Sequence, residues 1–364
     1  MLFGGPEMLR SEPTRPVTPL RVGVAVAGTE PTAATLDLAR RLDAGDAIEH
    51  LWVADERFRR DVWVMMGALA ATTSRLQLAT CVTDPFIRHP ALTGAAIATV
   101  DDAAPGRAIL GLGAGLSGFD ALGIARTAPA TALRDMIVFL RRFWRSDAPF
   151  EFASPSLRFT GARLGFLPRA PIPIYLAGRG PKILELAGEL ADGVLVATFV
   201  DGPLLEASLA RVADGESRRG ADLPPLEHVS WAYVSIDDDR EAARAAVREG
   251  IAVALWGSRP ILDGLGIRLP EALVRVMERR AYSIEAETIG EAARLVPDDL
   301  VDQCSIAGSP DEVARGLRRL AARGFGHVAC WLFPSRSVSQ RAMVERLGGE
   351  VVPRVRALES ANAP

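Results

Sequence analysis

The clearest fold signal in the chain is the stretch Ile174-Tyr175-Leu176-Ala177-Gly178-Arg179-Gly180-Pro181-Lys182-Ile183-Leu184. It reads as a short buried strand, a glycine-rich turn and the start of a helix with proline at its first position. The chain has 42 lysines and arginines together, and Lys182 is the only lysine among them. A compact ammonium beside free N–H groups at a helix start is typical of a phosphate site. A lone lysine on a solvated helix start is an equally simple interpretation of this stretch taken by itself.

The same alternation of strand, turn and amphipathic helix continues along the chain and predicts an α/β fold, a (β/α)8 barrel of the TIM type. A hairpin is predicted over Phe150–Phe159, and Ser309 with Glu312 predicts a capping box at a helix start. A doubly wound parallel sheet is the alternative architecture. The eight predicted strands are Val22–Val26, His50–Ala54, Leu76–Thr80, Arg107–Leu112, Pro173–Leu176, Gly193–Ala197, Val229–Ile236 and His327–Leu332.

The pattern predicts one barrel domain over residues 21–350, with a helical insertion at about 238–304 before the last strand. Residues 1–20 contain several prolines and charges and no apolar core of a signal peptide, so we expect a flexible N-terminal extension. Residues 351–364 are expected to form a C-terminal tail.

Composition favours a soluble cytoplasmic protein that acts on a small molecule. The net charge of −3 and the pI near 5.9 give no electrostatic reason to expect nucleic acid or an anionic membrane as partner. No apolar run reaches the roughly 20 residues that a membrane span needs. The three cysteines Cys81, Cys304 and Cys330 are far apart, which fits a reducing compartment and predicts no metal site.

In a barrel of this kind the site lies where the strands end, so the residues that follow each strand are the candidates. Asp55 and Glu56 follow the second predicted strand, and the third is followed by Cys81-Val82-Thr83-Asp84. Glycine-rich Gly113–Gly118 and the Gly178–Lys182 loop follow the next two. Small and polar positions at one mouth suit a bulky planar cofactor with a phosphate tail, although glycine is common in such turns anyway.

Other motifs carry less weight. Gly113-Ala114-Gly115-Leu116-Ser117-Gly118 matches the dinucleotide fingerprint, but it falls in the fourth unit and opens no helix at once, which argues against a nicotinamide fold. Of the four histidines, His50, His228 and His327 sit at strand starts and are expected to be structural. His89 follows a strand end and is a candidate for the site. Asp55 and Glu56 could be an acid/base element or could cap the next helix.

These loops resemble the luciferase-like superfamily of flavin and deazaflavin oxidoreductases, and within it the reductases of methylenetetrahydromethanopterin that use the deazaflavin coenzyme F420. The similar stretches span about residues 21–350. They include Asp61-Val-Trp-Val, Val82-Thr-Asp-Pro85, Arg88-His-Pro90, Gly111-Leu-Gly-Ala-Gly115, Gly180-Pro-Lys182 and Ser305-Ile-Ala-Gly-Ser-Pro-Asp-Glu312.

The resemblance implies a non-proline cis peptide at Cys81–Val82, behind the deazaflavin ring. It implies that Asp55, Thr83, Gly113 and Gly115 line the ring and its side chain. The cofactor's phosphate would lie on the loop of Gly178, Arg179, Gly180, Pro181 and Lys182.

Two departures from the reductases fall on the substrate side of the implied site. The reductases have a glutamate in strand one where this chain has Ala25, and related enzymes have a histidine where it has Glu56. We therefore expect Glu56, Asp84 and His89 to act in catalysis, and Arg88 and Ala25 to meet the substrate.

The resemblance implies an F420-dependent oxidoreductase that transfers a hydride between deazaflavin C5 and an imine, iminium or pterin-like carbon. It also implies a homodimer or a larger homo-oligomer. An FMN-dependent monooxygenase and a non-catalytic cofactor-binding paralogue are the alternatives.

Overall fold

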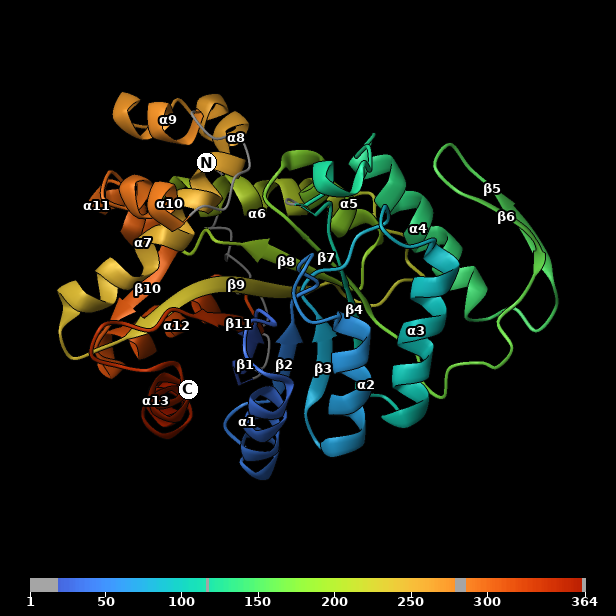
Figure 1. Ribbon diagram of the computed structural model, residues 1–364, viewed down its shortest axis with the longest axis horizontal. Helices are drawn as coiled ribbons and strands as arrows, with labels where there is room; N and C mark the ends of the chain where they lie inside the picture. Colours follow the sequence, from blue (N-terminus) through green and yellow to red (C-terminus); the bar gives the residue numbers. More distant parts are fainter. Residues whose placement is uncertain (1–18, 116–117, 279–285, 362–364) are drawn as a thin grey trace, which may run out of the picture.

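A closed barrel of parallel strands forms the centre of the molecule (Figure 1). The structure is a computed structural model that describes residues 19–115, 118–278 and 286–361. Around the barrel the strands follow the order β1, β2, β3, β4, β7, β8, β9, β11, and β11 pairs with β1 to close the ring. Closure excludes the doubly wound sheet and confirms the (β/α)8 prediction. The barrel strands are β1 (Arg21–Val26), β2 (His50–Val53), β3 (Gln77–Thr80), β4 (Ala108–Leu112), β7 (Ile174–Gly178), β8 (Gly193–Ala197), β9 (Glu227–Ile236) and β11 (His327–Leu332).

Helices surround the barrel because their apolar faces are buried against the outer side of the strands. The helices of the regular βα units are α1 (Thr32–Ala44), α2 (Val62–Thr72), α3 (Pro90–Ala103), α4 (Pro129–Phe143), α5 (Pro181–Leu190), α6 (Gly202–Glu216) and α12 (Pro310–Ala322). The capping box predicted at Ser309 and Glu312 is present at the start of α12. No helix among the described residues is long and apolar enough to cross a bilayer.

The segment between β9 and β11 is helical with one further strand. Its helices are α7 (Arg240–Gly257), α8 (Arg259–Gly264), α9 (Glu271–Glu278), α10 (Ala286–Ala293) and α11 (Asp298–Cys304). The strand, β10 (Ser305–Gly308), was not predicted. It exists because β9 is ten residues long: residues 227–231 pair with β8, and residues 233–236 pair with β10 on the same edge.

The predicted hairpin is confirmed as β5 (Phe150–Ala153) and β6 (Arg158–Ala162), and it projects beside α4 (Figure 1). After β11 come α13 (Gln340–Arg346), the π-helical η2 (Leu347–Val351) and α14 (Val352–Ala361). The expected tail thus contains a packed helix, since Val352 and Val355 are buried. Of the expected N-terminal extension, residues 1–18 lie outside the described residues, and the Leu20 N–H donates to Glu359 at 3.0 Å.

Two apolar clusters divide the core. The larger one lies between the barrel and its helices, and the smaller one fills the barrel interior. The interior is narrow and requires small residues where strands approach closely. A Cβ on Gly111 would lie 1.9 Å from the carbonyl oxygen of Thr80, so only glycine fits there.

Candidate functional site

The loops that follow β2 and β3 meet in a hydrogen bond at the C-terminal end of the barrel. Thr83 Oγ1 donates to Asp55 Oδ2 at 2.7 Å. Thr83 itself is fixed by its backbone, because its N–H donates to Gly111 at 3.0 Å and its carbonyl accepts from Gly113 at 2.9 Å. Burial raises the pKa of Asp55, and the Thr83 hydrogen bond opposes that rise. The structure thus brings together Asp55, Thr83 and Gly113, three residues predicted to line the cofactor.

The end of β3 carries the expected non-proline cis peptide between Cys81 and Val82. Cys81 is buried in the interior cluster, and burial raises the pKa of its thiol. Val82 is partly exposed and lies against Gly113, where an added Cβ would be 2.5 Å from Val82 Cγ2. Gly113 therefore lets the loop after β4 approach the Cys81–Val82 peptide closely.

A buried ion pair between Arg57 and Asp84 holds the loops together. The side chains of Arg57 and Asp84 are 8% and 1% exposed. Asp84 Oδ1 also accepts the N–H groups of Phe86 at 2.7 Å and Ile87 at 3.1 Å. Its carboxylate is thus fully engaged with the chain, which argues for a positioning role in place of the predicted catalytic one.

Arg57 also connects to the loop after β4. Its guanidinium carbon lies 4.1 Å from the centre of the Phe119 ring, a cation–π contact. An added Cβ on Gly115, whose φ is +64°, would lie 3.0 Å from Arg57 Nη2. The predicted cofactor residue Gly115 thus lies beside this arginine, which sequence reasoning missed. Leu116 and Ser117 lie outside the described residues.

Glu56 and Ala25 are the two residues at which the sequence predicts a departure from the reductases. Glu56 is partly exposed, and its carboxylate has no hydrogen bond or ion pair with any residue in the described ranges. Such a carboxylate is free to meet a substrate. Ala25, in β1, is buried in the interior cluster and pairs in register with Trp52 on one side and Trp331 on the other.

His89 and Arg88 lie elsewhere. His89 caps α3, with Nδ1 accepting the Ala91 N–H at 3.1 Å and Nε2 lying 3.0 Å from the Arg158 carbonyl of β6. Both ring nitrogens are therefore occupied by structural contacts, which argues against the predicted catalytic role. The guanidinium carbon of Arg88 lies 5.7 Å from the centre of the Trp63 ring on α2. Within the described part of the chain, neither residue forms a hydrogen bond or an ion pair with Asp55 or Thr83.

The Gly178–Lys182 loop ends at an uncapped helix start. Gly180 is the N-cap of α5 without a side-chain cap, Pro181 is at the first turn, and a Cβ added to Gly180 would meet nothing within 4 Å. The backbone here is open to a ligand, and the helix end favours an anion. Arg179 is partly buried and donates to the Ala254 carbonyl at 3.3 Å. The loop therefore fits the phosphate of a cofactor.

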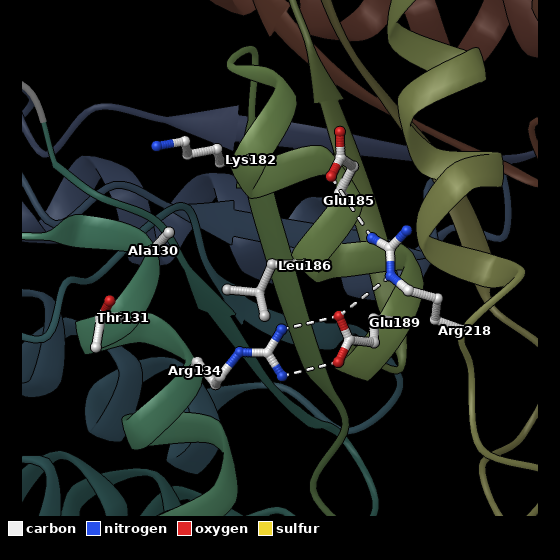
Figure 2. A pocket seen from close by; sticks show the side chains of 8 residues that line it. All are labelled: Ala130, Thr131, Arg134, Lys182, Glu185, Leu186, Glu189 and Arg218. Carbon is white, nitrogen blue, oxygen red and sulfur yellow. Dashed lines mark hydrogen bonds and ion pairs between the residues drawn. The ribbon is translucent and has the colours of Figure 1, made fainter. Parts of the chain in front are cut away.

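Lys182 is exposed and forms no ion pair with any described residue, so its charge is available to a ligand. Figure 2 shows its side chain leaving the first turn of α5, away from the charged groups further along a groove of about 220 Å³ between α4 and α5. In that groove Arg134 and Glu189 form a bidentate pair with two N–O distances of 2.8 Å.

Sequence reasoning also missed an aromatic surface on β9 and β11. Trp231 and Trp331 pack against the interior cluster, with ring centres 5.7 Å apart. The signal was present in the sequence, because Trp231 and Tyr233, like Trp331 and Phe333, are two residues apart in predicted neighbouring units. Among the described residues, no group of three or more His, Cys, Asp or Glu side chains could hold a metal ion.

The family profile described as luciferase-like monooxygenase matches residues 16–327. The chain belongs to this family. One relative, the 5,10-methylenetetrahydromethanopterin reductase of Archaeoglobus fulgidus, is 31% identical over 320 residues, 87% of this chain and 94% of that protein. The F420-dependent glucose-6-phosphate dehydrogenase of Beutenbergia cavernae is 30% identical over 301 residues, 81% of this chain and 82% of that protein.

Solved structures agree. The coenzyme F420 dependent tetrahydromethanopterin reductase of Methanopyrus kandleri superposes on this chain with a TM-score of 0.76 at 26% identity. The superposition covers 93% of this chain and 99% of the reductase. The expected family resemblance is therefore confirmed for nearly the whole chain. The monooxygenases among the structural matches are under 25% identical and show the shared fold alone.

Proposed function

We propose that the protein is an F420-dependent oxidoreductase. The observation that carries this proposal is the similarity along nearly the whole chain to enzymes named for F420, in both the reductase and the dehydrogenase branches. The site supports the same cofactor, since Asp55, Thr83, Val82, Gly113 and Gly115 gather at one part of the mouth. The loop from Gly178 to Lys182 would hold the phosphate.

When bound, reduced F420 supplies a hydride. We propose that the acceptor is an imine or iminium carbon, as in a pterin-like substrate. As that carbon accepts the hydride, the electron pair of the C=N π bond moves to nitrogen. A neutral imine then needs a proton on that nitrogen, whereas an iminium substrate gives a neutral amine without one. Glu56 is the proton donor in this proposal, because its carboxylate is partly exposed and engaged by no described residue. Asp55, whose pKa is raised by burial, would lie beside the ring with its carboxyl held by Thr83.

Glu56→Gln tests the proposed reaction. The amide keeps the size of the side chain but cannot give up a proton, so we expect turnover with reduced F420 and a neutral cyclic imine to fall by about 100-fold. Affinity for F420, measured by fluorescence titration, should stay within about twofold. Glu151→Gln, at an exposed position on β5, is the matched control and should match the unmodified protein. Full turnover by Glu56→Gln would remove Glu56 from the mechanism.

We also propose a homodimer or a larger homo-oligomer in the cytoplasm. The support is the outer face of α2 and α3, where Val64 and Leu92 are 73% and 57% exposed. Of the 11 residues of α2, none is charged, which is unusual for a helix on a solvated surface.

A further inference from the structure

Four aromatic side chains line the C-terminal part of β9 and β11. We call them the aromatic wall: Trp231, Tyr233, Trp331 and Phe333. The rings of Trp231 and Trp331 are stacked at 5.7 Å, with an angle of 27° between their planes. Tyr233 and Phe333 meet edge to face at 5.0 Å, and Phe333 lies against Gly250 of α7. All four are partly exposed.

The exposure of the two tryptophans indicates that this part of the wall faces the mouth, whereas Tyr233 and Phe333 pack against the larger cluster beside them. Trp231 and Trp331 pack against the interior cluster, so they point into the barrel. Lower in the same strands, Val229 and Ala329 point the same way and are fully buried. A side chain inside a closed barrel can reach solvent only at an open end, which here is the C-terminal end of the strands.

The wall lies across the barrel from the proposed cofactor residues. In a ring of eight strands, β9 is four strands from β3 in both directions, and β11 is four strands from β4. Trp231 and Trp331 thus belong to the strands opposite those that end in Val82 and Gly113. Val82, Trp231 and Trp331 are the three partly buried apolar side chains that pack on the interior cluster.

The floor between the two sides is small and uncharged. It includes Ala25, Ala177 and Ala329, all buried in the interior cluster. Ala25 pairs in register with Trp331, so strand β1 offers a methyl group beside an indole at this level. A substrate above this floor would find aromatic faces and no carboxylate from strand one.

We propose that the aromatic wall is the substrate subsite and that it selects hydride acceptors that carry a flat ring system. This inference rests on the proposed function, because it takes the opposite side of the mouth to hold the cofactor. Aromatic faces stack on flat aromatic rings and also attract an iminium cation. A substrate without an aromatic ring loses the stacking contact.

Two cyclic imines form a matched pair of probes. 3,4-Dihydroisoquinoline has a benzene ring fused beside its C=N bond, and 1-pyrroline has the same kind of bond without that ring. Each is titrated into protein loaded with oxidised F420, which cannot give a hydride, so the measurement reports binding and no turnover. The F420 affinity of every variant is measured first.

The unmodified protein should bind 3,4-dihydroisoquinoline at least tenfold more tightly than 1-pyrroline. Trp331→Leu should abolish most of this preference while its affinity for F420 stays unchanged, and Trp331→Phe, which keeps a ring, should retain it. Trp256→Leu is the matched control, because Trp256 contacts Arg259 and belongs to neither apolar cluster. If Trp331→Leu does not fold, Trp231→Leu carries the same expectation.

An unmodified protein that binds both imines equally, or a Trp331→Leu variant that keeps the full preference, would overturn the inference and leave the proposed function intact. Failure of the unmodified protein to bind F420 would instead overturn the proposed function, and this inference with it.

Discussion

Two uncharged imidazoles face each other inside the N-terminal end of the barrel. The ring centres of His50 and His327 are 3.9 Å apart, and both side chains are buried. Burial lowers the pKa of His50 to about 3, helped by the charge of Arg21, and burial likewise lowers the pKa of His327. The expectation that these histidines are structural agrees with this position, since it leaves neither ring free for a ligand at the mouth.

Acid should destabilise the barrel through these histidines. The unfolded chain takes up a proton near pH 6.5 but the folded chain does not, so stability is lost as the pH falls through 6.5 toward the folded value. Between about pH 7 and pH 5, His50 alone should cost about 2 kcal/mol of unfolding free energy. In urea unfolding at the two pH values, His50→Phe should remove this share of the pH dependence and leave that of His327. His228→Phe, at a partly exposed position, is the control. An unchanged pH dependence in His50→Phe would contradict this assignment.

Single residues at the mouth could be predicted only in part. The polar residues after β2 and β3 were found because barrel topology alone puts the ends of the strands together. Their roles depend on contacts that sequence spacing does not reveal. Asp84 is paired with Arg57, 27 residues away, and His89 is held by a carbonyl of β6, 69 residues away. Neither pairing has a local signal.

At the scale of elements, the loops after β2, β3 and β4 are connected through Arg57. The side chains of Arg57 and its ion-pair partner Asp84 are nearly inaccessible to solvent. Removal of either one therefore leaves the other buried without its countercharge. Arg57→Met should therefore lower the free energy of unfolding by about 3–5 kcal/mol. Arg41→Met breaks an exposed pair with Asp37 and should cost no more than about 1 kcal/mol.

A double-mutant cycle of Arg57→Met and Asp84→Asn, followed by urea unfolding, measures the coupling of this pair. We expect the double variant to be more stable than the sum of the single changes implies. Additive single effects would show that the two side chains act independently.

Strands with a full βα unit were predicted well, whereas β10 was missed. Six of the barrel strands stand between two helices, which supply a change of periodicity on both sides, and β1 and β7 are each followed by a helix. β10 has only four residues and follows α11 without a loop, so its period-two signal is too short to read. It forms because β9 extends past β8 and leaves part of an edge unpaired.

At the scale of the whole molecule, the apolar face of α2 and α3 predicts self-association. The face is free of charge at Val64, Gly67 and Leu92, and a second copy offers the same uncharged surface. Val64→Glu with Leu92→Glu should convert the assembly to monomers in light scattering at micromolar concentration. Val138→Glu, at an exposed apolar position of α4, is the control and should not change the mass. A monomeric unmodified protein would contradict this prediction.

At this scale the central proposal is that the barrel binds F420, and a titration of the purified protein with F420 tests it most directly. We predict saturable binding with a dissociation constant below the order of tens of micromolar. Lys182→Met should weaken binding by about tenfold through loss of a phosphate contact, and Arg40→Met, on the outer side of α1, should not. Absence of F420 binding at such concentrations, or tighter binding of FMN than of F420, would contradict the account.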